Sequence, residues 1–199
     1  MTLSIILSVI VGIFTGYFLV PATLISSMNT ITTIALNFLI LFVGIDIGLN
    51  KDIFKDFKKH GRLLILIPFS IIIGSLIGGL ITGFILKIPN NISLSIASGF
   101  GWYSLSGILL SKLHTVETGT IAFLANVFRE LITIISIPFL AKYLNYYTTI
   151  APAGATSMDS TLPIISKYTN PEIVVISFFN GAILSALVPI LVPFFYTMF

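Results

Sequence analysis

The sequence predicts an all-α integral membrane protein with several membrane-spanning helices. Composition is the first observation: 56% of the residues are apolar and only 9% are charged, with a mean hydropathy of +1.09. A soluble domain keeps about a quarter of its residues charged. The second observation is that the apolar residues form long uninterrupted runs. The chain has no cysteine, which excludes disulfides and thiolate metal sites.

About five of these runs are predicted to be full transmembrane helices. A helix needs roughly 20 apolar residues to cross a bilayer. The first run is too long for the core of a signal peptide, so we expect it to be retained as a helix. The fifth carries polar and charged residues in its interior. The predicted helices are 3–20, 31–49, 63–86, 172–199 and, with Asn126, Arg129 and Glu130 inside it, 119–142.

Two further apolar segments, 92–111 and 151–168, are interrupted by small and polar residues. Residues 151–163 read Ala-Pro-Ala-Gly-Ala-Thr-Ser-Met-Asp-Ser-Thr-Leu-Pro, and their glycine and prolines favour an unwound backbone. Irregular backbone at membrane depth is tolerated only where it lines a cavity or is buried in protein. We therefore expect a polytopic helical transporter in which both segments are discontinuous. Whether they cross the membrane or re-enter stays open.

The basic loop 50–62 predicts the orientation. By the positive-inside rule it is cytoplasmic, which also puts the N-terminus inside. Lys112 and Lys167 end the two broken segments, and the C-terminus falls outside whether these segments cross or both re-enter. Residues 1–199 are expected to form one transmembrane transport domain. Its odd number of crossings hints at a missing partner, because inverted-repeat transporters have paired halves.

Asp159 and Glu130 are the main candidate site residues. A charged group in a bilayer costs at least ~2.5–3.5 kcal/mol, so it usually has a partner, a cavity or a function. Asn126 and Glu130 share one helix face, and Arg129 lies one position round, able to turn toward Asp159. Thr156 and Ser157 could supply hydroxyl groups next to Asp159. The alternative is a structural pair of Arg129 with an acid that only holds two helices together.

Trp102, Tyr103 and Ser104 form the second candidate group, within the glycine-rich stretch 99–107. The two aromatic rings could face an ammonium group. Alternatively they belong to the aromatic belt at the lipid headgroups, and the glycines to close helix packing. Asp46 is a secondary candidate whose other interpretation is an interfacial acid near Lys51. The two histidines are far apart, and no metal-ligand spacing is present.

At these residues the chain resembles the lysine exporters of the LysO type, bacterial inner-membrane proteins. The matching stretches are 99–107, 123–131 with its Arg129-Glu130 pair, and 154–163. The resemblance implies export of L-lysine and toxic lysine analogues without a cofactor, with two essential intramembrane acids that fall on Glu130 and Asp159. It also implies that family members are often longer than this chain. A separate three-helix membrane protein or a second copy of the chain would then be a partner, and membrane lipid is a further expected partner. Nucleic acid is not an expected partner.

The predicted mechanism is lysine–proton antiport, with lysine and protons competing for the two carboxylates. Three alternatives remain. A cation–proton antiporter or channel would use the same acids. A subunit of a larger assembly would transport only with its partner. An intramembrane aspartyl protease would pair Asp46 with Asp159, but its usual Gly-x-Gly-Asp signature is absent, so we expect no enzyme.

Overall fold

The computed structural model describes residues 61–198 continuously and, before them, only residues 7, 11, 14–16, 18, 34, 38 and 45. The chain forms two compact units, 1–50 and 51–199. The few described residues of the first unit are helical. The predicted helices 3–20 and 31–49, Asp46 and the loop 50–60 thus lie almost wholly outside the described residues. Whether 1–199 acts as a single transport domain stays a prediction.

The described residues contain only helices and connecting turns, which confirms the helical fold class. Three helices are long and apolar enough to cross a membrane: α4 (Gly61–Leu86), α7 (Val116–Tyr143) and α10 (Pro171–Met198). They agree with the predicted helices 63–86, 119–142 and 172–199 within a few residues. Each has 26 or 28 residues, or about 40 Å at the rise of an α-helix.

Both interrupted segments are broken, as predicted. In the first, α5 (Asn90–Ala97) and α6 (Tyr103–Leu113) are separated by a turn at 98–102. In the second, η1 (Tyr146–Thr149) and α8 (Ile150–Ala153) lead to the irregular η2 (Gly154–Met158), which α9 (Leu162–Tyr168) follows. We call residues 90–113 hairpin 1 and residues 146–168 hairpin 2.

Hairpin 1 enters and leaves at the same end of α10. Near its start, the amide of Asn91 donates to the Tyr196 carbonyl at 3.5 Å. Just past its end, the His114 ring lies 5.9 Å from the Tyr196 ring. Because Tyr196 lies in the last turn of α10, α5 and α6 run in opposite directions, and the segment does not cross.

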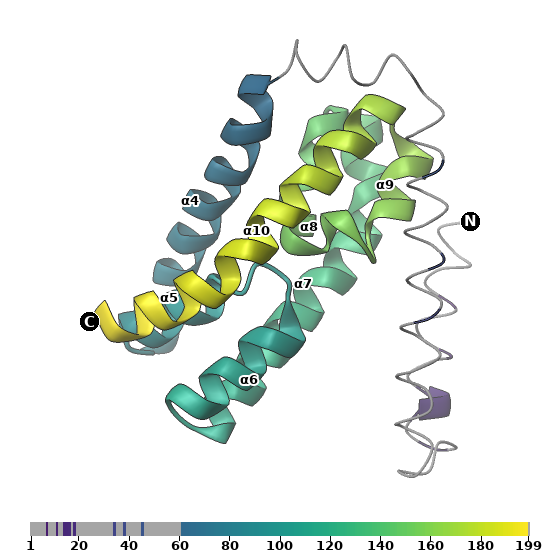
Figure 1. The fold of residues 1–199 in the computed structure, drawn as a ribbon. Helices are drawn as coiled ribbons and strands as arrows, with labels where there is room; N and C mark the ends of the chain where they lie inside the picture. Colours follow the sequence, from purple (N-terminus) through teal and green to yellow (C-terminus); the bar gives the residue numbers. More distant parts are fainter. Residues whose placement is uncertain are drawn as a thin grey trace. The chain divides into compact units, whose positions relative to one another are not determined.

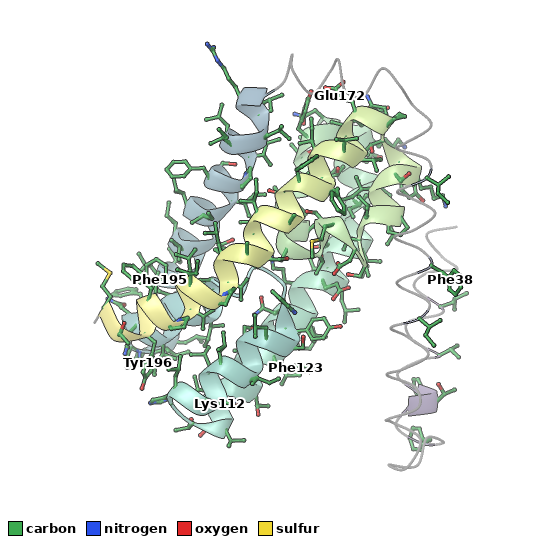
Figure 2. The ribbon with its side chains drawn as sticks, viewed as in Figure 1. Phe38, Lys112, Phe123, Glu172, Phe195 and Tyr196 are labelled. Atoms are coloured by element: carbon green, nitrogen blue, oxygen red, sulfur yellow. The ribbon has the colours of Figure 1, made fainter. Side chains whose placement is uncertain are left out.

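Hairpin 2 enters and leaves at the other end of α10. At its start, the Tyr147 phenol donates to Glu172, the second residue of α10. At its end, only Thr169 and Asn170 separate α9 from α10. The two hairpins therefore enter from opposite ends of the bundle, hairpin 1 below and hairpin 2 above (Figure 1). Figure 2 shows the same ends, with Glu172 at the upper and Lys112 and Tyr196 at the lower end.

Small residues allow the close approach of these elements. A Cβ at Gly119 would collide with the Ser111 hydroxyl, which fixes how tightly α6 packs on α7. A Cβ at Gly181 would collide with the backbone nitrogen of Met158, where α10 passes hairpin 2. Around these contacts lies a core of fully buried side chains, among them Phe100, Leu110, Ile137, Ile165 and Leu184.

Candidate functional site

The tips of the two hairpins meet inside the bundle. The backbone N–H of Ala155 donates to the Phe100 carbonyl at 2.8 Å. Gly154 has φ +59°, and a Cβ there would collide with the Phe100 carbonyl oxygen. Only glycine adopts that conformation freely and also permits such an approach. Two irregular backbone segments, one from each end of the bundle, are thus joined at one point.

The two candidate acids lie near one another, and Asp159 lies close in sequence to this junction. Glu130 comes from the middle of α7 and Asp159 from the turn of hairpin 2, and Asp159 lies close enough to act electrostatically on Glu130. Both also act on the phenol of Tyr103, the first residue of α6. All three side chains are partly buried. The structure thus brings together three predicted site residues from three separate elements.

Ser160 lies between the acids and was not among the predicted site residues. Its hydroxyl donates to Oδ1 of Asp159 at 3.3 Å, and this oxygen also accepts the Ser160 backbone N–H. The same hydroxyl lies close enough to interact with the Glu130 carboxylate. One hydroxyl has one proton, so it can donate to only one carboxylate at a time. Its only signal in the sequence was its place beside Asp159.

Asn126 holds the tip of hairpin 1. Its Oδ1 accepts the N–H of Gly101 at 2.7 Å, and its Nδ2 donates to Ala122 and Ser106. The side chain is 3% exposed and its hydrogen-bonding groups are occupied by protein. This predicted site residue therefore positions backbone, one turn of α7 away from Glu130.

Arg129 holds the tip of hairpin 2. Its Nε donates to the Pro152 carbonyl at 3.0 Å, one terminal nitrogen to Ser75 of α4 at 3.0 Å, and the other to the Ala151 carbonyl at 3.4 Å. All three partners are neutral oxygens. The side chain thus satisfies carbonyls that the break in the helix leaves free, and it ties them to α4.

Of the remaining predicted residues, some hydrogen-bond the tip of hairpin 2 and others lie exposed or line a groove. Ser157 is fully buried, with its hydroxyl between the Gly154 and Ser177 carbonyls, and Thr156 bonds the Ala153 carbonyl, so both serve the tip. Trp102 is 38% exposed. Ser104 lines a groove of about 440 Å³ between α6 and α7, together with Lys112 and Phe123. The described residues contain no group of three His, Asp or Glu side chains able to hold a metal ion.

Comparison with known sequences identifies the family. The family described as "Lysine exporter LysO" matches residues 6–196. The chain belongs to this family. It is 43% identical over 157 residues to "Lysine exporter LysO" of Escherichia coli K12, an alignment that covers 79% of this chain and 52% of that protein. It is 37% identical over 159 residues to "Putative lysine exporter" of Haemophilus influenzae, covering 79% of this chain and 80% of that protein. The chain thus spans about half the length of the Escherichia coli family member. No solved structure matches.

The family gives a context for the geometry. A family of exporters, with helices able to cross a bilayer, makes this chain a membrane protein of a transport family. In transporters generally, broken helices near mid-membrane form binding sites, and ionisable groups inside the membrane mark ion or substrate pathways.

Proposed function

We propose that the chain exports L-lysine from the cytoplasm across the bacterial inner membrane, in exchange for protons. The observation that carries the proposal is the convergence of Glu130 and Asp159 beside the joined hairpin tips. The names of the relatives support the substrate. Toxic lysine analogues share its ammonium groups and would follow the same route. The proposal involves no enzymatic step and no cofactor.

The chemistry of the site suits a cation. Lysine has two ammonium groups and one carboxylate at neutral pH, and two carboxylates at one site offer two charged acceptors. The Tyr103 ring would add a cation–π contact, worth about 0.5–2 kcal/mol. Ser160 would direct its single proton to whichever carboxylate is free. Arg129 already makes three hydrogen bonds to neutral oxygens of the protein. We therefore favour a role for Arg129 in fixing the tip of hairpin 2 rather than in binding the carboxylate of lysine.

Competition for the carboxylates would couple lysine to protons. Moving the +1 charge of lysine out of a negative interior costs about 2.3 kcal/mol per 100 mV. Exchange for one proton cancels this cost, and two protons per lysine would add the membrane potential to the driving force. Lysine would displace protons from Glu130 and Asp159 on the inside, and protons would displace lysine on the outside.

The test is efflux of lysine from proteoliposomes. We expect Asp159→Asn to abolish the proton-driven efflux, because the amide can neither ionise nor carry a proton. Glu117→Gln is the matched control, since this acid lies on the same helix as Glu130 but in its exposed first turn. Undiminished efflux with Asp159→Asn would refute the mechanism.

The position of the basic residues supports an orientation. Arg62, the last residue of the basic loop 50–62, lies at the same end of the described bundle as Lys142 and Lys167. Lys87 and Lys112 lie at the other end. The positive-inside rule then makes the first end cytoplasmic. Hairpin 2 would enter from the cytoplasm and hairpin 1 from outside, where the C-terminus would also lie.

A partner is part of the proposal because the alignment covers only 52% of the Escherichia coli relative. That partner would be a separate small membrane protein or a second copy of this chain. If the chain shows no efflux on its own but gains it when the neighbouring gene is expressed with it, the partner is a separate membrane protein. Sodium or potassium flux without lysine flux would instead favour the runner-up, a cation–proton antiporter or channel.

A further inference from the structure

The described sequence repeats itself after 55 positions. Residues 87–143 and 142–198 align without a gap, and the matches fall at equivalent places in the structure. Both halves begin with a lysine, have a glycine at the hairpin tip and have Ser-Lys near the end of the second arm. In both halves the second residue of the long helix is Glu, and Pro-Phe occurs near the end of that helix. The identical pairs include Lys87/Lys142, Asn90/Asn145, Gly99/Gly154, Lys112/Lys167, Glu117/Glu172, Pro138/Pro193 and Phe139/Phe194.

The structure repeats with the sequence. Each half is a hairpin whose two arms are followed by a long helix, and α7 and α10 have 28 residues each. Thr115 and Asn170 occupy equivalent positions, and each side chain caps its long helix by accepting a backbone N–H, from Thr118 and Ile173 respectively. Because the hairpins enter from opposite ends, the two halves are inverted with respect to each other. This is the construction from which transporters obtain two opposite-facing states.

One asparagine on each long helix holds the neighbouring hairpin tip, but the two are not in the same condition. The Nδ2 of Asn126 donates to the Ala122 carbonyl, and its Oδ1 accepts the backbone N–H of Gly101. Asn180, at almost the equivalent position, donates with Nδ2 to the Gly154 carbonyl at 3.0 Å and to Ser157 at 2.9 Å. Its Oδ1 is buried and has no hydrogen-bond partner within the described part of the chain, and the side chain is only 1% exposed. Buried acceptors of this kind are rare, so each one needs an explanation.

We propose that Asn126 and Asn180 are alternating latches, by which we mean side chains that hydrogen-bond a hairpin tip in one conformational state and release it in the other. In the state described here, Asn126 holds hairpin 1 with both its oxygen and its nitrogen, whereas Asn180 holds hairpin 2 through its nitrogen alone among the described residues. Inverted repeats exchange conformations when access changes sides. In the opposite state the Oδ1 of Asn180 therefore receives a tip N–H of hairpin 2, and Asn126 releases Gly101. The proposal rests on the proposed function only in requiring that the site opens to both sides.

The test uses the absence of cysteine from the chain. A single reporter, Ser160→Cys, places a thiol between the two acids. Its rate of modification by a membrane-impermeant maleimide is measured in right-side-out and in inverted vesicles, and the ratio of the two rates reports which side is open. Asn126→Ala and Asn180→Ala are compared in this background. Asn145→Ala is the matched control, because its exposed side chain caps η1 away from the tips.

We expect the two latch variants to move the ratio in opposite directions. Loss of one hydrogen bond from one of two states corresponds to a change of about three- to tenfold. Under the proposed orientation, Asn126→Ala increases access from outside and Asn180→Ala increases access from the cytoplasm. Asn145→Ala should leave the ratio unchanged. Should an alanine variant fail to reach the membrane, serine at the same position tests the same shift.

Shifts in the same direction, or an unchanged ratio in folded protein, would overturn the latches and leave both asparagines as packing residues. Labelling needs no lysine, so the outcome is separate from the proposed function. Opposite shifts, together with no lysine efflux by the chain that keeps Ser160, would keep the latches and reject the substrate. Efflux with an unmoved ratio would keep the substrate and reject the latches.

Discussion

At the scale of single residues, neighbours in sequence have separate tasks. Glu130 faces Asp159, whereas Arg129 points to the carbonyls of Pro152 and Ala151 and to Ser75. Adjacent residues on a helix point about 100° apart, so one can face the site while the other fixes the backbone that builds it. The dipeptide thus combines a candidate binding residue with a positioning residue.

Arg129→Ala should therefore destabilise the protein. A hydrogen bond to a charged group contributes about 1.5–3 kcal/mol, and truncation removes all three. Arg129→Lys keeps the charge, but its single nitrogen cannot reproduce the planar fork, so we expect an intermediate loss. Thermal unfolding of the purified protein is the measurement, with Arg62→Ala, at the exposed start of α4, as control. Lost efflux with unchanged thermal stability would instead make Arg129 a substrate clamp.

At the scale of elements, two short hairpins create a candidate site that no continuous helix could provide. A continuous helix uses its backbone groups internally, whereas a broken one leaves carbonyls and N–H groups that must find partners. Here Arg129, Asn126 and Asn180 supply many of these partners. The tips can then approach closely enough for one direct backbone bond between Ala155 and Phe100.

Gly154→Ala should separate the tips. The added Cβ collides with the Phe100 carbonyl oxygen. The backbone at this position also has a positive φ, a conformation that alanine avoids. We expect lower thermal stability and loss of efflux. Gly74→Ala is the matched control, because a Cβ there meets no atom within 4 Å and the residue has an ordinary helical conformation. Equal effects of the two substitutions would contradict the close approach at Gly154.

At the scale of the whole molecule, re-entry decides which residues share a side of the membrane. If both broken segments crossed, Lys112 and Lys167 would face the same side. With two hairpins that enter from opposite ends, they face opposite sides. We expect Lys112→Cys to react with an impermeant maleimide from outside and Lys167→Cys from the cytoplasm. Labelling of both from one side would contradict the hairpins.

The proposed proton coupling would also be a property of the whole molecule. We expect lysine efflux to increase when the outside is made more acidic than the inside, because outside protons then compete better for the two carboxylates. The increase should disappear on addition of a protonophore. Efflux from proteoliposomes that is unchanged by the pH gradient, at constant membrane potential, would contradict antiport.

Sequence alone determined much of this molecule. Runs of apolar residues long enough for a bilayer predicted α4, α7 and α10, and clusters of glycine, serine and proline predicted that 92–111 and 151–168 are broken. These are local properties, because helix length, helix propensity and transfer from water depend on residues close together in the chain. The 55-residue repeat was also present in the sequence, but at low identity it acquires meaning only when both copies have the same structure.

Only the tertiary structure decided how the broken segments run and which residues meet. Crossing and re-entrant segments of equal length have the same composition, so the choice depends on packing against α10, through contacts such as that of Asn91 with Tyr196. The role of Arg129, the place of Ser160 between the acids and the bonds that hold the Asn180 amide depend in the same way on partners 22 or more positions away. Hydrogen bonds between distant segments form only once the fold brings them together, and no local pattern records them.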